Sequence, residues 1–255
     1  MSIHHINEGT GKLLVFQHGL GSDITQSQRL LGALPHVRLA GIDCPGHGRS
    51  PFPNKMLPSY EFYADQLLQQ LDALQIGPAI FGGISMGSGI ALNIALRFPE
   101  RVKGLILVRP AWLDQPTPDN LKILLTAADH MGQPGGKAAF QQLEVFKTMQ
   151  QQLPNAARSV LGVFAETQQK ELPTVLRQLV NDRPFDQLEK IRDIQKPCII
   201  LANDDDPLHP YEMAETLHRH LPGSQLHKVT SRYVDDAAHG VAVRALVQQF
   251  VKEIG

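Results

Sequence analysis

The chain has 255 residues, of which 42% are hydrophobic and 19% charged, a composition typical of a folded globular protein. Its formal net charge of −1 indicates no basic surface for nucleic acid. Two cysteines cannot build a disulfide framework, and they fit a reducing compartment. Neither a basic and apolar leader nor an apolar run long enough to span a bilayer is visible in the sequence. We therefore expect a cytoplasmic protein with no membrane span, and composition leaves its oligomeric state open.

Short apolar runs recur along the chain and predict strands. They cover residues 13–16, 37–42, 78–84, 105–108, 198–202 and, more weakly, 226–229. Most are apolar on both faces and end at turn residues, as strands of a buried parallel sheet do. Helical spacing of apolar residues occurs between and after them, at 60–74, 86–98, 213–221 and 241–254. This alternation predicts an α/β fold with a doubly wound, mostly parallel sheet and helices on both faces.

The alternation stops between about residues 112 and 190. This stretch has helical patterns at 121–131, 137–153, 156–164 and 174–180 and no convincing strand. Because the strand pattern resumes at residue 198, we predict an α/β core made of residues 1–111 and 191–255. Residues 112–190 are then an inserted all-helical cap, and a separate helical domain is the alternative.

The segment Gly83-Ile84-Ser85-Met86-Gly87 has the pattern G-x-S-x-G between a predicted strand and a predicted helix. This is the setting of a nucleophile elbow, a tight turn that needs small residues on both sides of the serine. Such a turn exposes the Ser85 hydroxyl and places the Met86 N–H at a helix start, where it can stabilise an oxyanion. The alternative is a glycine-rich turn in which Ser85 only caps the helix.

A serine nucleophile needs a base that takes its proton. His239 lies between the last predicted strand and the last predicted helix, so we expect it on a loop at the same sheet edge as Ser85. His18 and His47 are better suited to orient or shape turns. We expect the remaining histidines without such context, His209 among them, at the surface.

The base in turn needs a carboxylate that fixes its tautomer. The acidic loop 203–206 follows a predicted strand and lies between the serine and the histidine in chain order. We expect Asp206 to orient His239, with Asp114 as the alternative outside this loop. Asp235 and Asp236 are interpreted as loop charges.

Two further features complete the predicted site. The backbone N–H of Leu20, in the loop 18–22, is expected to be the second oxyanion donor beside Met86. Trp112 follows a strand end where the predicted cap begins, which makes it our candidate for the substrate pocket. Arg109 follows the same strand, and we expect it to pair with an acid at the surface.

Five segments together resemble the α/β-hydrolase superfamily in chain order. They are His18-Gly19-Leu20-Gly21, Asp43-Cys44-Pro45-Gly46-His47-Gly48-Arg49-Ser50, Gly83-Ile84-Ser85-Met86-Gly87, Asp206 with Pro210, and His239-Gly240. The order Ser, Asp, His is that of the superfamily. The resemblance covers residues 13–254 and implies this fold with a Ser85–His239–Asp206 triad and no cofactor. No H-E-x-x-H or C-x-x-C motif indicates a metal site.

The predicted function is hydrolysis of an ester or related acyl bond of a small, largely apolar molecule through an acyl-enzyme. The same triad also serves lactonases, C–C bond hydrolases and acyl transferases. The fold further hosts lyases and cofactor-independent oxygenases, and a non-enzymatic ligand receptor or regulator can retain it.

Overall fold

The computed structural model describes residues 2–52, 57–165 and 170–254 and contains one seven-stranded sheet. The strand order is β1-β3-β2-β4-β5-β6-β7, with β1 antiparallel to β3 and all other neighbours parallel. The strands are β1 (His5–Gly9), β2 (Lys12–Gln17), β3 (Val37–Ile42), β4 (Ala79–Ile84), β5 (Val102–Val108), β6 (Cys198–Ala202) and β7 (Ser224–Lys228).

The six predicted strands are all present, and β3 and β6 have the predicted bounds. The sequence missed β1, an edge strand in which only Ile6 is buried and the other four residues are not. A strand that contributes one side chain to the core has no apolar run to reveal it.

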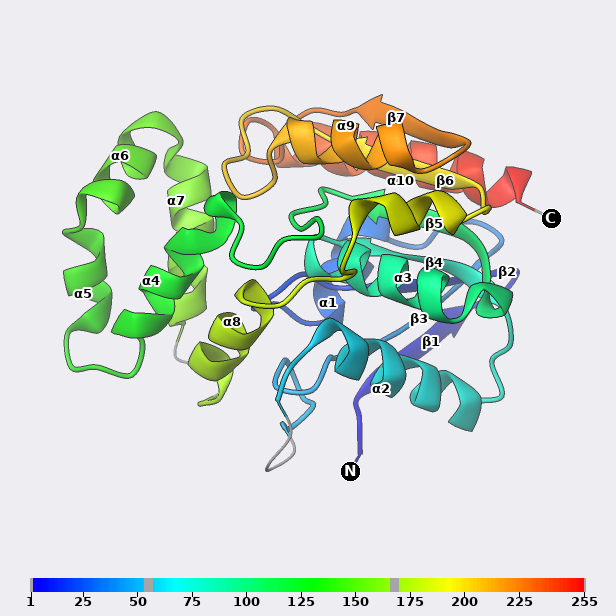
Figure 1. The fold of residues 1–255 in the computed structure, drawn as a ribbon, viewed down its shortest axis with the longest axis horizontal. Coiled ribbons are helices and arrows are strands. Elements are labelled where there is room, and N and C mark those ends of the chain that lie inside the picture. The colour runs from blue at the N-terminus through cyan, green and yellow to red at the C-terminus, as the bar shows by residue number, and fades with distance from the viewer. Residues whose placement is uncertain (1, 53–56, 166–169, 255) are drawn as a thin grey trace.

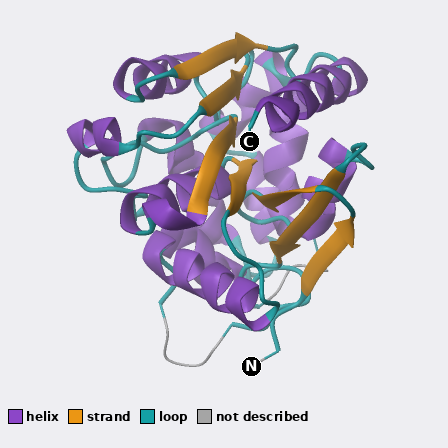
Figure 2. Cartoon of the chain, turned by 90° about the vertical axis from the view of Figure 1, so that its right-hand side faces the viewer, coloured by secondary structure: helices purple, strands orange, loops and turns teal. Residues whose placement is uncertain are grey.

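Helices cover both faces of the sheet, which confirms the predicted doubly wound arrangement (Figures 1 and 2). One face packs against α1 (Ile24–Leu31) and α10 (Asp236–Glu253), and the other packs against α2 (Tyr60–Ala73), α3 (Met86–Arg97) and α9 (Tyr211–His220). Short 3-10 helices lie at Pro99–Arg101, Asp119–Leu121, Gly162–Phe164 and Leu188–Asp193. None of the helices within the described ranges is long and apolar enough to cross a bilayer.

Five helices lie between β5 and β6 in chain order and form a group beside the sheet (Figure 1). They are α4 (Lys122–His130), α5 (Gly136–Gln141), α6 (Glu144–Gln152), α7 (Pro154–Leu161) and α8 (Leu172–Val180). The ring of Phe140 packs against Phe146 and Phe164 at centroid distances of 5.1 and 5.2 Å, which joins this group internally. The division of the chain into core and cap domains remains a prediction.

Two helices differ from their predicted bounds. The helix expected over 137–153 is divided into α5 and α6. Helix α10 begins at Asp236, five residues before the predicted start, because Asp235 is its N-cap and accepts a hydrogen bond from the Ala238 N–H at 2.9 Å. Asp235 is therefore a helix cap, not a loop charge, and His239 lies in the first turns of α10, not on a loop.

Parallel pairing brings the ends of several strands together. Ser85 follows β4, Arg109 follows β5 and Asn203 follows β6, so these residues lie at the carboxyl edge of the sheet. The loop 18–22 follows β2 at the same edge. In open α/β sheets this edge is where ligands bind.

Candidate active site

Ser85 is held in a strained turn between β4 and α3. Its φ of 56° and ψ of −111° are rare for a residue with a side chain. A Cβ on Gly83 would lie 2.5 Å from the backbone of Gly87, and a Cβ on Gly87 would overlap the carbonyl oxygen of Gln17. Ser85 occupies the N-cap position, but its hydroxyl makes no cap hydrogen bond. The geometry therefore fits the elbow and disfavours the capping alternative.

Two backbone N–H groups near this turn are uncommitted. Neither Leu20 nor Met86 donates its amide hydrogen to an acceptor within the described part of the chain. A Cβ on Gly19 would lie 3.6 Å from the Cβ of Ser85, so the loop that carries Leu20 packs against the serine. Both predicted oxyanion donors are thus beside Ser85 and free to bind a ligand oxygen.

Side chains hold this loop in place. Gln26 Oε1 accepts a hydrogen bond from the Gly19 N–H at 2.8 Å. His18 accepts from the Cys44 N–H through Nε2 at 3.0 Å, so its Nδ1–H donates to the Gly19 carbonyl at 2.9 Å. Burial lowers the pKa of His18, which keeps the imidazole in the neutral form that this pairing needs. His18 therefore orients the loop, as predicted.

His239 is buried, and its Nδ1 lies 2.8 Å from the Thr230 carbonyl oxygen. Because a carbonyl can only accept, Nδ1 carries the hydrogen, and the lone pair on Nε2 is left to receive a proton. Burial lowers the pKa of His239, and the charges of Arg109 and Arg232 lower it further. The imidazole is therefore neutral at pH 7, as a general base must be.

Asp206 does not make the predicted contact with His239. Its Oδ2 lies 3.1 Å from a guanidinium nitrogen of Arg109, and its Oδ1 lies 2.8 Å from Nδ1 of His209. Thr230 takes the position at Nδ1 of His239 that the sequence assigns to this carboxylate. The physical reason is that a buried guanidinium requires a counter-ion, and Arg109 is 4% exposed.

Arg109 and His209 are therefore both buried, whereas the sequence predicts them at the surface. Burial alone would raise the pKa of Asp206, but the charges and hydrogen bonds of His209 and Arg109 outweigh it and hold that pKa well below its usual range. Burial also lowers the pKa of His209. The cluster is thus an Asp206–Arg109 ion pair to which His209 adds a hydrogen bond.

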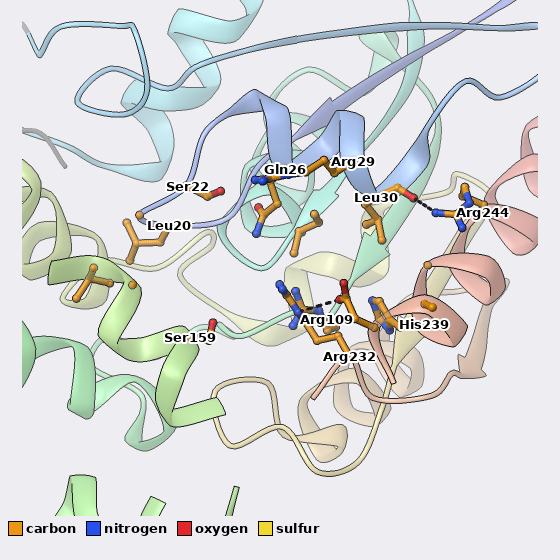
Figure 3. Close-up of a pocket in the computed structure, with 17 residues that line it drawn as sticks. Leu20, Ser22, Gln26, Arg29, Leu30, Arg109, Ser159, Arg232, His239 and Arg244 are labelled. Atoms are coloured by element: carbon orange, nitrogen blue, oxygen red, sulfur yellow. Dashed lines mark hydrogen bonds and ion pairs between the residues drawn. The ribbon is translucent and has the colours of Figure 1, made fainter. Parts of the chain in front are cut away.

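Two adjoining hollows lie around these residues (Figure 3). The larger, about 620 Å³, contains His239, and the smaller, about 90 Å³, contains Ser85, His209 and Trp112. Both are lined by Leu20, Gln26, Ile84, Arg109, Ser159, Val163 and Arg232. Because their walls are shared, Ser85 and His239 face neighbouring parts of one site.

The remaining predicted residues are placed as follows. Trp112 is buried in the wall of the smaller hollow, where its ring meets Tyr60 edge-on at 5.7 Å. Asp114, the alternative acid, accepts a hydrogen bond from the Leu188 N–H at 3.1 Å. It therefore connects the two ends of the inserted segment.

Sequence reasoning missed the Thr230 carbonyl and the arginines of the larger hollow. A backbone carbonyl carries no sequence signal. Arg232 lies seven residues before His239, and this proximity could have drawn attention to it. Arg29 and Arg244 come from α1 and α10 and meet only in the folded chain.

Comparison with known proteins supports this geometry. A family model described as "alpha/beta hydrolase fold" matches residues 12–240, and the chain belongs to this family. The chain is 27% identical over 253 residues to the pimeloyl-[acyl-carrier protein] methyl ester esterase of Neisseria meningitidis, an alignment that covers 93% of this chain and 92% of that protein.

Solved structures agree on the fold. The enol-lactonase from Burkholderia xenovorans matches with a TM-score of 0.77 at 20% identity and covers 98% of this chain and 96% of its own. A thermophilic esterase from Thermogutta terrifontis matches with a TM-score of 0.74 at 20% identity and covers 97% and 93%. These likenesses show the fold, and the relatives, which are esterases, hydrolases and lactonases, support a hydrolase.

Proposed function

We propose that this protein is a serine hydrolase that cleaves an ester or related acyl bond through an acyl-enzyme on Ser85. The observation that carries the proposal is the turn at Ser85, whose strained backbone presents an uncapped hydroxyl beside two uncommitted N–H groups. The esterase named among the relatives supports the bond type.

In this proposal, Ser85 Oγ attacks the carbonyl carbon while its proton passes to Nε2 of His239. The N–H groups of Leu20 and Met86 stabilise the oxyanion that forms. His239 then gives its proton to the leaving alcohol. A water molecule, deprotonated by His239, finally releases the acid from Ser85.

The roles of Thr230 and Asp206 follow from their contacts. The Thr230 carbonyl fixes the tautomer of His239, the task that the sequence assigns to Asp206. Asp206 neutralises Arg109 at the border of the two hollows. The direct Asp206–His239 contact of the predicted triad is the alternative, and the two assignments differ in their kinetics (see Discussion).

The inserted helices complete the site. Ser159 of α7 and Val163 of the following 3-10 helix line both hollows, and Trp112 lines the smaller one. We propose that these helices are a cap that shapes the substrate pocket, with Trp112 against the acyl or leaving group.

The test is hydrolysis of short and medium p-nitrophenyl esters by the wild type and by Ser85→Ala, with lactones as a parallel panel. Loss of the nucleophile is expected to lower kcat by about 10⁴-fold or more. A serine-directed fluorophosphonate should add its mass to the wild type and not to Ser85→Ala. Ser224→Ala, on β7 outside both hollows, is the matched control. Full activity in Ser85→Ala would refute the mechanism, and ligand binding without turnover or adduct would favour a receptor.

A further inference from the structure

The larger hollow has a positive wall. Among its described lining residues one carboxylate, Asp236, faces four arginines: Arg29, Arg109, Arg232 and Arg244. The chain as a whole has a net charge of −1, so this excess is local and does not reflect the overall composition. Four guanidinium groups that converge on one hollow repel one another unless an anion joins them.

Arg109 is the deepest of these groups. Its backbone φ of 49° is a left-handed conformation that a residue with a side chain rarely adopts, so the fold retains local strain at this position. One guanidinium nitrogen is bound to Asp206. The Nε atom is buried and has no hydrogen-bond partner within the described part of the chain. A buried N–H of a charged group that lacks an acceptor is costly, and a ligand oxygen would satisfy it.

Arg232 lines both hollows, as Arg109 does, and Figure 3 shows the two side chains in the same part of the site. Its Nε lies 3.5 Å from Oδ1 of Asp236, a contact that is long for an ion pair and involves a carboxylate that is 77% exposed. Such a pair is weak in water and leaves the guanidinium available to a ligand.

Arg244 and Arg29 extend the positive wall outward. Arg244 donates one hydrogen bond to the Leu30 carbonyl at 3.0 Å, which places its guanidinium at the end of α1 (Figure 3). No ion pair within the described residues involves Arg29 or Arg244. Their structural roles at the helix end use part of their hydrogen-bonding capacity and none of their charge.

We infer that the larger hollow binds an anionic oxyacid group of the substrate, a carboxylate or a phosphate, through Arg109 and Arg232 with Arg244 and Arg29 at its rim. Arginine is the residue that recognises these planar or tetrahedral oxyanions with paired hydrogen bonds. A hollow of about 620 Å³ is large enough for the body of a small molecule as well as its charged group.

This inference rests on the proposed function and specifies its substrate class. The acyl carbonyl lies at Ser85 in the smaller hollow, and the anionic group lies in the adjoining larger one. The substrate is therefore an ester or related acyl compound that carries a negative charge some atoms away from the bond that is cleaved. This departs from the largely apolar substrate that the sequence predicts.

The kinetic test compares two p-nitrophenyl esters of equal length, p-nitrophenyl valerate and the mono-p-nitrophenyl ester of glutaric acid, which ends in a carboxylate. We expect the wild type to have the higher kcat/KM for the anionic ester. Arg232→Gln should lower the ratio of anionic to neutral kcat/KM by about tenfold to a hundredfold, the scale of one charged hydrogen bond. Arg232→Lys, which keeps the charge, should retain part of it.

Arg219→Gln is the control, because Arg219 is exposed on α9 and its substitution removes the same charge away from the hollow. It should leave the ratio unchanged. Arg109→Gln is not used because it also breaks the buried pair with Asp206 and would destabilise the fold.

The binding test is independent of turnover. Glutarate and inorganic phosphate are titrated by calorimetry into Ser85→Ala at low ionic strength, with and without Arg232→Gln. Heat from either anion that disappears with Arg232→Gln supports the inference, and the anion that binds identifies the oxyacid.

Absence of binding by both anions, together with an unchanged ester ratio in Arg232→Gln, would overturn it. If Ser85→Ala instead keeps full esterase activity, the proposed mechanism fails, and calorimetry still decides the anion site.

Discussion

Asp206→Asn separates the two assignments of this carboxylate. In the structure Asp206 is the counter-ion of buried Arg109 and accepts a hydrogen bond from His209, whereas Thr230 holds His239. Asparagine keeps the shape and one acceptor oxygen but removes the charge. The substitution should therefore act mainly on stability.

The magnitude follows from burial. The Asp206 side chain is fully buried and that of Arg109 is 4% exposed, so removing one charge leaves the other without compensation in the interior. Breaking such a pair costs about 3–5 kcal/mol. For a chain of this size each kcal/mol shifts Tm by roughly 2–4 °C. We expect Tm to fall by about 6–12 °C, a value at the lower end of the product because asparagine keeps a hydrogen bond.

Thermal and urea unfolding at pH 7 measure this loss, and esterase kinetics well below the lowered Tm measure the other term. If Thr230 orients His239, kcat should fall less than about tenfold. Loss of a carboxylate that holds the catalytic histidine directly costs about 10⁴-fold in the serine-protease triad. A fall of 10³-fold or more with an unchanged Tm would refute the pairing argued here.

The pH dependence gives a further check on the same variant. The pKa of Asp206 is held well below its unfolded value of about 4, so its charge stabilises the fold above that value and the contribution is lost as pH falls through the folded pKa. The stability difference between wild type and variant should therefore be equal at pH 6 and pH 8 and shrink below about pH 4. A difference that changes between pH 6 and 8 would point to another titrating group.

Two other predictions concern the base and the turn. The pKa of His239 is lowered, and catalysis needs its neutral form, so the acid limb of kcat/KM should lie below pH 6.5. Arg232→Gln removes one of the charges that lower it and should move that limb upward by roughly 0.3–1 pH unit, and an unmoved limb would exclude His239 as the titrating base. Gly87→Ala should destabilise the fold by about 1–3 kcal/mol in urea unfolding, because its Cβ overlaps a carbonyl of β2. Gly77→Ala, where a Cβ meets open space, is the control, and equal midpoints for the two variants would contradict the packing argument.

The sequence by itself determined the sheet, the turn at Ser85 and the glycines that it needs. These features are local: an apolar run, a tight turn and a helix start lie within about ten residues, so spacing alone reveals them. The oxyanion loop after β2 was predictable for the same reason. The bounds of α10 were not, because the Asp235 cap overrode the position at which apolar periodicity begins.

Only the tertiary structure decided how the charged groups pair. Arg109 and Asp206 are 97 residues apart, and they meet because β5 and β6, separated by the inserted helices, are neighbours in the sheet. His239 pairs with a backbone carbonyl, which has no residue type to recognise. The arginine wall likewise assembles from α1, α10 and two loops. Pairing in a buried site depends on which charges the folded chain removes from water together, and no local pattern records that.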